Sequence, residues 1–296
     1  MNRLTLTSSD NPRIKNAIRL KESRVRRKEK RFLIDGVREI IRAWKSGYSF
    51  IEIYVDSDFL ETREPDSGFN TRHTGERQWF LCQVAEKQIP VFAVLPHLFK
   101  KIGFGERNEG IIALVQAENN TLEALEQRLP QNPLLGVLEG VEKPGNTGAV
   151  FRSADGAGLD GLIIATPNLD LYNPNIIRAS LGTVFHLPTA IAPAAEVVKW
   201  LKQKKIAVAA AICDRNRTRN YTEFDYTQPT AIVLGNEADG LTSLWSDSPF
   251  LNQNDAAILI PMLGIADSLN ISNAAAILFY EARRRRMEKN IPKTEF

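Results

Sequence analysis

Short apolar runs alternate with amphipathic stretches along the chain, and this alternation predicts an α/β protein. The apolar runs have the length of buried strands and are bounded by turn-forming or polar residues. They are residues 51–55, 91–95, 111–115, 134–140, 161–165, 206–211, 231–235 and 256–261. Apolar residues at helical spacing predict helices from Pro12, from Val37, and near 147–157, 174–180, 194–204 and 270–288. The regular alternation in the second half favours a parallel sheet covered by helices on both faces.

Two polar stretches interrupt this pattern. Residues 61–78 are hydrophilic and contain two glycines, which is typical of a long surface loop. Residues 117–133 read AENNTLEALEQRLPQNP between two apolar segments, and a short helix at 122–129 fits within them. The second stretch marks the one plausible domain boundary. The predicted domains are 1–116 and 133–296, joined by a linker at 117–132.

Length and composition exclude several classes of protein. The 296 residues are 43% hydrophobic and 25% charged, as expected for one or two globular domains. No apolar run approaches the ~18 residues of a membrane span, and the first residues lack the apolar core of a secretory signal. The two cysteines and three histidines lie far apart, so neither a disulfide framework nor a metal site is expected. These features favour a reducing, cytoplasmic location.

Charge is distributed unevenly along the chain. Residues 1–50 contain 14 Lys and Arg against 5 Asp and Glu, a balance of +9, whereas the remainder contains 24 against 30, a balance of −6. A basic segment on a mildly acidic body indicates a phosphate-rich partner such as nucleic acid. A solvated helix face with unpaired Lys and Arg explains the charge count equally well.

Candidate chemistry lies in three loops that follow apolar strands, because open α/β sheets bind ligands at the carboxyl ends of their strands. In the first loop, Gly145 and Gly148 flank Asn146 before a helix, and Arg152 lies further into that helix. Free backbone N–H groups at a helix start favour an anion or a close ligand approach. The loop contains neither a dinucleotide fingerprint nor a phosphate-loop motif, and alone it fits an ordinary strand–turn–helix junction.

The other two loops are less ordinary. Gly235, Asn236, Glu237 and Gly240 follow a very apolar strand, where a carboxylate is unusual. In the third loop two helix-breaking residues are followed by a cluster of small polar residues at the start of a long helix. They are Pro261 and Gly264, then Ser268, Asn270, Ser272 and Asn273. One of these polar residues is sufficient to cap the helix, so the surplus indicates a ligand.

Together these loops resemble the SPOUT class of RNA methyltransferases, specifically the TrmH (SpoU) branch of ribose 2′-O-methyltransferases. The resemblance covers residues 134–286 and depends on four elements in the family's order. They read GNTGAVFRSADGAG, YNPNIIRASLGTVFHLP, VLGNEADGL and IPMLGIADSLNISNAAAILFYEARR. The N-terminal stretch SSDNPRIKNAIRL…RFLIDGVREI is similar to the substrate-binding domain that many members carry, which resembles small α/β RNA-binding ribosomal proteins.

The resemblance implies a fold and a cofactor. It implies an N-terminal α/β RNA-binding domain followed by an α/β SPOUT domain with a C-terminal deep trefoil knot, a feature nearly absent from other folds. It implies S-adenosyl-L-methionine as the methyl donor, with Gly235, Ile260 and Leu269 lining the adenosine pocket and Met262 and Gly264 close by. It also implies a homodimer formed through the knot domain.

The resemblance further implies five catalytic positions. They are Asn146, Arg152, Glu237, Ser268 and Asn270. The guanidinium of Arg152 is a poor base, so we expect it to orient a phosphate or to stabilise developing alkoxide charge. Arg178 is either structural or faces RNA. The chain departs from the common pattern at Ala238, where glycine is frequent, and at Asn273, where a small aliphatic residue is frequent.

The predicted function is therefore methylation of a ribose 2′-hydroxyl in structured RNA, with ribosomal RNA favoured and transfer RNA left open. An RNA-binding protein with weak or lost activity on the same fold is one alternative, and methylation of a base is another. The run Arg283–Arg286 fits the favourable end of a helix dipole, with RNA contact as the second reading. Phe32 is expected to pack in the core, with base stacking as its alternative.

Overall fold

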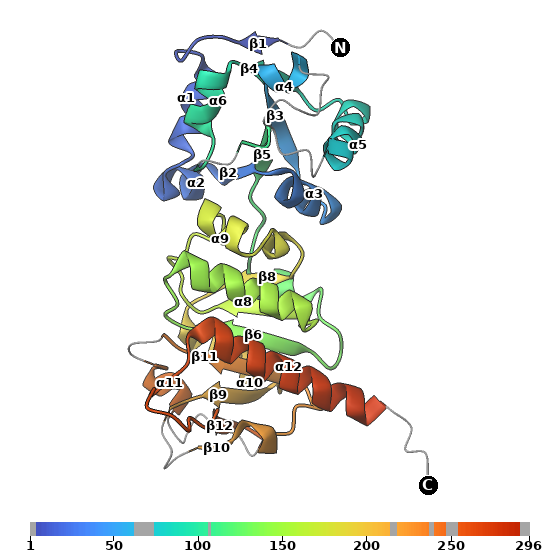
Figure 1. Cartoon of the computed structure of the whole chain (residues 1–296). Coiled ribbons are helices and arrows are strands. Elements are labelled where there is room, and N and C mark those ends of the chain that lie inside the picture. Colours follow the sequence, from blue (N-terminus) through green and yellow to red (C-terminus); the bar gives the residue numbers. More distant parts are fainter. Residues whose placement is uncertain are drawn as a thin grey trace. The chain divides into compact units, whose positions relative to one another are not determined.

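The computed structural model describes residues 4–61, 74–105, 108–213, 218–236, 240–246 and 254–290. The chain forms two compact units (Figure 1). The first consists of Met1–Glu118 together with Asp170–His186, and the second of Asn119–Leu169 together with Leu187–Phe296. Within the described ranges, no helix has the length and apolar character needed to cross a membrane.

The first unit is built on a five-stranded mixed sheet. Its strands, in spatial order, are β1 (Thr5–Leu6), β4 (Val91–Val94), β3 (Phe50–Asp56), β5 (Ile111–Gln116) and β2 (Arg31–Asp35). Strand β5 runs antiparallel to both of its neighbours. The helices are α1 (Pro12–Arg19), α2 (Ser23–Glu29), α3 (Val37–Lys45), α4 (Ser57–Glu61), α5 (Thr74–Glu86), α6 (Pro96–Ile102) and α9 (Pro174–Ala179).

The loop predicted for residues 61–78 is wrong for its last part, because α5 begins at Thr74. Residues 62–73 lie outside the described ranges. Aromatic contacts pack helix α5 against α3 and β3, and the polar residues of its first turn do not predict this packing. The ring of Phe80 lies 5.3 Å from Trp44 in an edge-to-face arrangement and 5.6 Å from Phe50.

The segment 170–186 completes the core of the first unit. Phe32 is fully buried and stacks on Tyr172, with ring centroids 4.1 Å apart, which confirms that Phe32 packs in the core. The buried Arg26 side chain forms an ion pair with Asp170 and donates hydrogen bonds to the carbonyl oxygens of Leu20 and Lys21, both at 2.7 Å. Arg26 therefore serves the fold and is not available to RNA.

Arg178 likewise has a structural role within this unit. Its guanidinium donates to the carbonyl oxygen of Phe104 at 2.6 Å. The Phe104 N–H donates in turn to the carboxylate of Asp35 at 2.7 Å. Burial raises the pKa of Asp35 to about 6, and the hydrogen bond from Phe104 and the nearby charge of Arg178 limit that rise.

The second unit contains the predicted parallel sheet, now seen to have seven strands. In spatial order they are β10 (Arg219–Asn220), β12 (Ala256–Leu259), β9 (Ala207–Ala211), β11 (Thr230–Leu234), β6 (Leu134–Leu138), β7 (Gly161–Ile164) and β8 (Thr189–Ile191). Every strand pair in it is parallel, as the continuous apolar runs predicted. The helices are α7 (Leu122–Glu126), α8 (Pro144–Gly156), α10 (Ala194–Gln203), α11 (Ser243–Ser246) and α12 (Ile271–Asn290).

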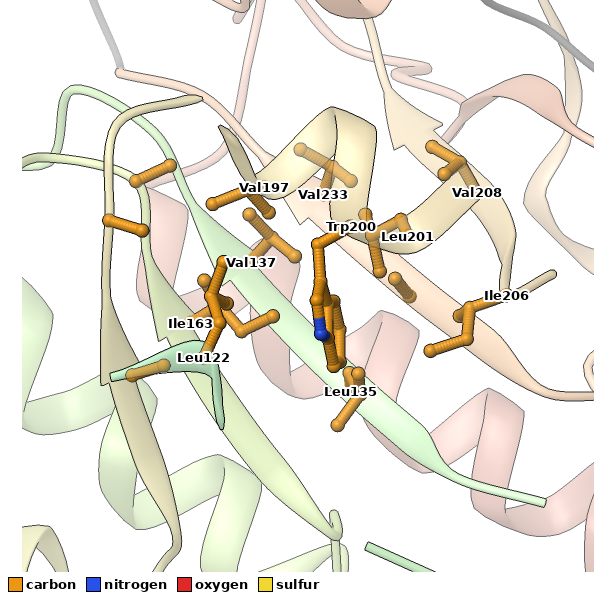
Figure 2. Packing of buried hydrophobic residues seen from close by; sticks show 14 of the residues in the cluster. Leu122, Leu135, Val137, Ile163, Val197, Trp200, Leu201, Ile206, Val208 and Val233 are labelled. Carbon is orange, nitrogen blue, oxygen red and sulfur yellow. The ribbon is translucent and has the colours of Figure 1, made fainter. Parts of the chain in front are cut away.

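Helices cover both faces of this sheet. On one face, α7 and α10 pack against alternate strand residues such as Leu135 and Val137, with Trp200 at the centre of the cluster (Figure 2). On the other face, α8 and α12 pack against each other (Figure 1). Helix α12 lies so close to the sheet that a Cβ atom at Gly136 would stand 3.0 Å from the Phe279 ring.

The arginine run at the end of α12 binds backbone carbonyl groups of the second unit. Arg283 donates to the carbonyl oxygen of Ala157 at 2.7 Å, at the end of α8. Arg286 donates to four carbonyl oxygens at 2.8–2.9 Å, which belong to Asn132, Pro133, Tyr226 and Gln228. Arg284 instead pairs with Glu281 and Glu288 on its own helix. Arg283 and Arg286 of this run therefore stabilise the second unit through hydrogen bonds to its backbone.

These contacts predict unequal costs for two neighbouring substitutions. Arg286→Ala leaves several carbonyl oxygens without their charged donor, so the free energy of unfolding of the second unit should fall by about 2–4 kcal/mol. Arg284→Ala removes ion pairs within one helix, made by an exposed side chain, and Glu281 keeps its pair with Arg285, so the unfolding midpoint should stay close to that of the wild type. Urea unfolding followed by circular dichroism measures both variants. Equal midpoints for the two would contradict a structural role for Arg286.

Candidate active site

A pocket of about 460 Å³ opens at the carboxyl ends of β9, β11 and β12. Three strands of a parallel sheet end at this edge, as the rule for open α/β sheets predicts. Of the predicted cofactor and catalytic residues, five line the pocket. They are Gly235, Ile260, Met262, Ser268 and Leu269. Residues from the second and third predicted loops therefore meet around one cavity.

The wall formed after β11 depends on a glycine. A Cβ atom at Gly235 would lie 2.3 Å from the backbone carbon of Gly240, a distance that no side chain tolerates. The loop closes through an isolated bridge between Asn236 and Gly240, in which the Gly240 N–H donates to the Asn236 carbonyl oxygen at 2.9 Å. Glu237 and Ala238, which occupy this loop, lie outside the described residues.

The third loop ends in the cap of α12. The side-chain oxygen of Asn270 accepts hydrogen bonds from the backbone N–H of Ser272 at 3.0 Å and from its hydroxyl at 2.6 Å. The side-chain nitrogen of Asn270 donates to the side-chain oxygen of Asn146 at 3.3 Å. Asn270 therefore fixes the helix start and joins the first predicted loop to the third.

Asn146 lines a second, smaller cavity of about 120 Å³ together with Val141, Glu142 and Lys143. The two cavities adjoin, since Asn236 and Ile271 contribute to the walls of both. The first predicted loop thus stands beside the larger pocket rather than within it.

Two predicted residues lie elsewhere. Arg152 projects from the exposed part of α8 and lines neither cavity. Gly264 lies in the exposed stretch between β12 and α12 and is not among the lining residues of the larger pocket. Its neighbours Leu263 and Ile265 are 98% and 103% exposed, so this stretch presents apolar side chains to the surface.

Sequence reasoning missed other residues of the pocket wall. Ala211, Ile212 and Cys213 contribute from the end of β9, and Asp267 contributes from the third loop. The same carboxyl-end rule, applied to the apolar run 206–211, would have found the residues after β9. Asp267 stands directly before Ser268, and its charge in a glycine-containing loop was the available signal.

The chemistry of the larger pocket suits a ligand with both an apolar and a charged part. Its size falls within the range of cofactor sites, and Leu234, Ile258 and Ile260 provide apolar walls. Asp267 and Ser268 supply a carboxylate and a hydroxyl for a cationic or hydrogen-bonding group. Across the described part of the chain, no cluster of His, Cys, Asp or Glu suits a metal ion.

Two family models match the chain. The SpoU rRNA methylase family matches residues 133–280, and an MRM3-like substrate-binding domain matches residues 11–113. Both matches agree with the resemblance found in the sequence motifs.

Individual relatives match over most of their length. A 23S rRNA (uridine(2479)-2′-O)-methyltransferase of Streptomyces viridochromogenes is 33% identical over 86% of this chain and 83% of its own. The crystal structure of an RNA 2′-O ribose methyltransferase is 38% identical, with a TM-score of 0.74 over 96% of this chain and 99% of its own. The SpoU methyltransferase AviRb of S. viridochromogenes, in complex with AdoMet, is 28% identical, with a TM-score of 0.79 over 94% and 98% of the two chains.

These matches cover both halves of the sequence and the whole of the second sheet. The chain belongs to the SpoU rRNA methylase family.

Proposed function

We propose that this protein transfers the methyl group of S-adenosylmethionine to a ribose 2′-hydroxyl of ribosomal RNA. The observation that carries this proposal is the pocket at the ends of β11 and β12, which adjoins Asn146 in a chain of the SpoU family. Relatives that match nearly the whole chain are named as 23S rRNA 2′-O-methyltransferases. Relatives named for both tRNA and rRNA match about half of it, which favours ribosomal RNA.

The larger pocket is the proposed donor site. When bound, S-adenosylmethionine supplies an electrophilic methyl group. Gly235, Ile260 and Leu269 would enclose its adenosine, because they offer backbone groups and apolar surface, and Met262 lies in the same wall. Gly264 stays a predicted neighbour of the donor. Asp267 supplies negative charge that suits the cationic parts of the donor.

The proposed catalytic residues have different roles in activating the ribose hydroxyl. Glu237 carries the one carboxylate among them and is assigned as the proton acceptor on its chemistry. Asn146 and Asn270 orient groups beside the pocket, and Ser268 contributes a hydroxyl to its wall. Arg152, which is exposed on α8, would bind a phosphate of the RNA.

The proposed RNA-binding surface lies on the first unit. Helix α2 exposes Arg24, Arg27 and Lys28, and Lys30 and Arg31 follow it on the surface. Arg26 is excluded because it is buried with Asp170. The exposed basic residues of α1 form ion pairs with Glu52, Asp10 and Glu29. The excess positive charge of the first fifty residues therefore reaches solvent mainly through α2 and the turn after it, where it can attract phosphates.

We also propose a trefoil knot and a homodimer formed through the second unit. Helix α12 follows β12, near one edge of the sheet, yet packs against α8, which precedes β7 near the other edge. Such a path supports a knotted chain. The exposed Leu263 and Ile265, with Ile277 and Tyr280 of α12, offer apolar surface for a second copy. The proposal is completed by a cytoplasmic location and by the sequence domains 1–116 and 133–296 with the linker 117–132, the segment Asp170–His186 of the second domain packing with the first unit.

The activity is tested with radiolabelled S-adenosylmethionine and unmodified ribosomal RNA, digested and separated by nucleoside. We expect label in a 2′-O-methylnucleoside. Arg152→Ala should lower kcat/KM by about 100-fold, since it removes the charged donor that would hold an RNA phosphate and thereby orient the target ribose. Arg284→Ala, which removes an exposed arginine of α12, should leave the rate unchanged. Label in a methylated base, or donor binding without any transfer, would refute the proposed reaction.

The RNA surface is tested through the salt dependence of RNA binding. Replacing Arg24, Arg27 and Lys28 together with alanine should reduce the slope of log K against log salt by about 2–3, because three phosphate contacts are lost. The matched control replaces three exposed lysines of the second unit, Lys199 and Lys202 on α10 and Lys205 shortly after it. If the control flattens the slope as much as the α2 variant, α2 is not a specific RNA surface.

The homodimer is tested by analytical ultracentrifugation. Leu263→Glu with Ile265→Glu places two charges in the proposed interface and should convert the dimer to a monomer. Leu4→Glu changes an exposed leucine of the first unit and serves as the control. A wild-type protein that sediments as a monomer at micromolar concentration would exclude this assembly.

A further inference from the structure

A buried carboxylate lies at the end of β6, beside the proposed donor pocket. Glu139 is 6% exposed, and its backbone N–H donates to the carbonyl oxygen of Leu234 at 2.9 Å. Leu234 is the last residue of β11 and lines the pocket. Glu139 itself does not line it, so an effect of Glu139 on a ligand there must pass through other residues.

Both oxygens of this carboxylate are used on one residue. One oxygen accepts a hydrogen bond from the backbone N–H of Thr242 at 2.8 Å, and the other accepts from the Thr242 hydroxyl at 2.8 Å. Among the residues with described positions, no Lys or Arg forms an ion pair with Glu139. Burying a carboxylate without a cation is costly, and an apolar residue would fill this position at lower cost. The presence of a carboxylate at position 139 is therefore better explained by its contact with Thr242 than by a contribution to stability.

Thr242 stands at the end of the pocket wall. Gly240 and Leu241, directly before it, line the pocket, and Gly240 is tied back to Asn236. After Thr242 the chain enters α11, which the fully buried Trp245 anchors in the core. The hydrogen bonds from Thr242 to Glu139 therefore attach the wall residues Gly240 and Leu241 to the end of β6.

We propose that Glu139 is a positioning residue for the methyl donor, because its carboxylate holds Thr242 and thereby keeps the wall formed by Gly235, Gly240 and Leu241 in its binding conformation. If the wall occupies this conformation for only a fraction of the time, the apparent Kd for the donor rises by the inverse of that fraction. The inference rests on the proposed donor site and adds a residue to it that contacts no ligand.

Isothermal titration of the full-length protein with S-adenosylmethionine tests the proposal. Glu139→Leu keeps a similar side-chain volume but accepts no hydrogen bond, so both bonds from Thr242 are lost and the donor Kd should rise about tenfold. Thr242→Val keeps the backbone N–H and should show a smaller rise. The double variant should bind no more weakly than Glu139→Leu, because both changes break one contact. In steady-state assays the KM for the donor should rise while the KM for RNA stays within about twofold.

Two controls separate positioning from folding and from the identity of the site. Asp255, another buried carboxylate, accepts a hydrogen bond from the Val208 N–H at 2.8 Å near the amino ends of the strands. Asp255→Asn should lower stability without changing the donor Kd. Leu269→Arg puts a charged side chain into the pocket and should abolish donor binding.

The outcomes separate the two proposals. If Leu269→Arg abolishes donor binding while Glu139→Leu and Thr242→Val bind the donor like wild type, the role of Glu139 is overturned. If Leu269→Arg binds the donor normally, the pocket is not the donor site and both proposals fail. Should Glu139→Leu not fold, Thr242→Val decides alone, since it removes one bond at an exposed residue. An unchanged donor Kd in that variant overturns the role of Glu139.

Discussion

The close return of the backbone after β11 is the constraint on which the candidate site depends. Strand β11 ends between β9 and β6, and after it the chain turns back so that Asn236 bridges to Gly240. The turn brings Gly240 within a distance of Gly235 that excludes any side chain. The pocket lies beside this turn, at the ends of β9 and β12. A larger residue at 235 would push the loop outward and change the shape of that wall.

Arginine side chains provide a second level of organisation, and they do so by binding carbonyl oxygens. Arg26 in the first unit and Arg286 in the second each satisfy several backbone acceptors at places where chain segments meet. A guanidinium suits this task because it offers five donors in a fixed plane and stays charged when buried. The basic character of the sequence is thus partly a property of its interior, and charge counts overestimate the surface that remains for RNA.

The parallel sheet of the second unit could be predicted because its strands are buried on both faces and read as continuous apolar runs. In the first unit, the edge strand β2 was not predicted, because its five residues begin and end with charged side chains. Strand β8 has only three residues, too few for a periodicity to register.

The donor-pocket residues Gly235, Ile260 and Leu269 came from the resemblance to a family and from the carboxyl-end rule, and they do meet in one cavity. That Asp170–His186 packs with the first unit could not be predicted, because its partners Arg26 and Phe32 are more than 130 residues away in sequence. Local patterns carry no information about such pairing. The contact between Thr242 and Glu139 could not be predicted for the same reason, because these residues are 103 positions apart.

The start of α12 shows how a structural need and a chemical one can be met by the same residues. A helix that begins beside a pocket must satisfy its first N–H groups, and Asn270 does so through Ser272. Its amide then has a donor left over, which reaches Asn146 across to α8. Since the cap fixes the amide in one orientation, Asn146 is oriented as well. The polar residues Asn270 and Ser272 therefore have two roles at this helix end: they cap the helix, and they orient Asn146 beside the pocket.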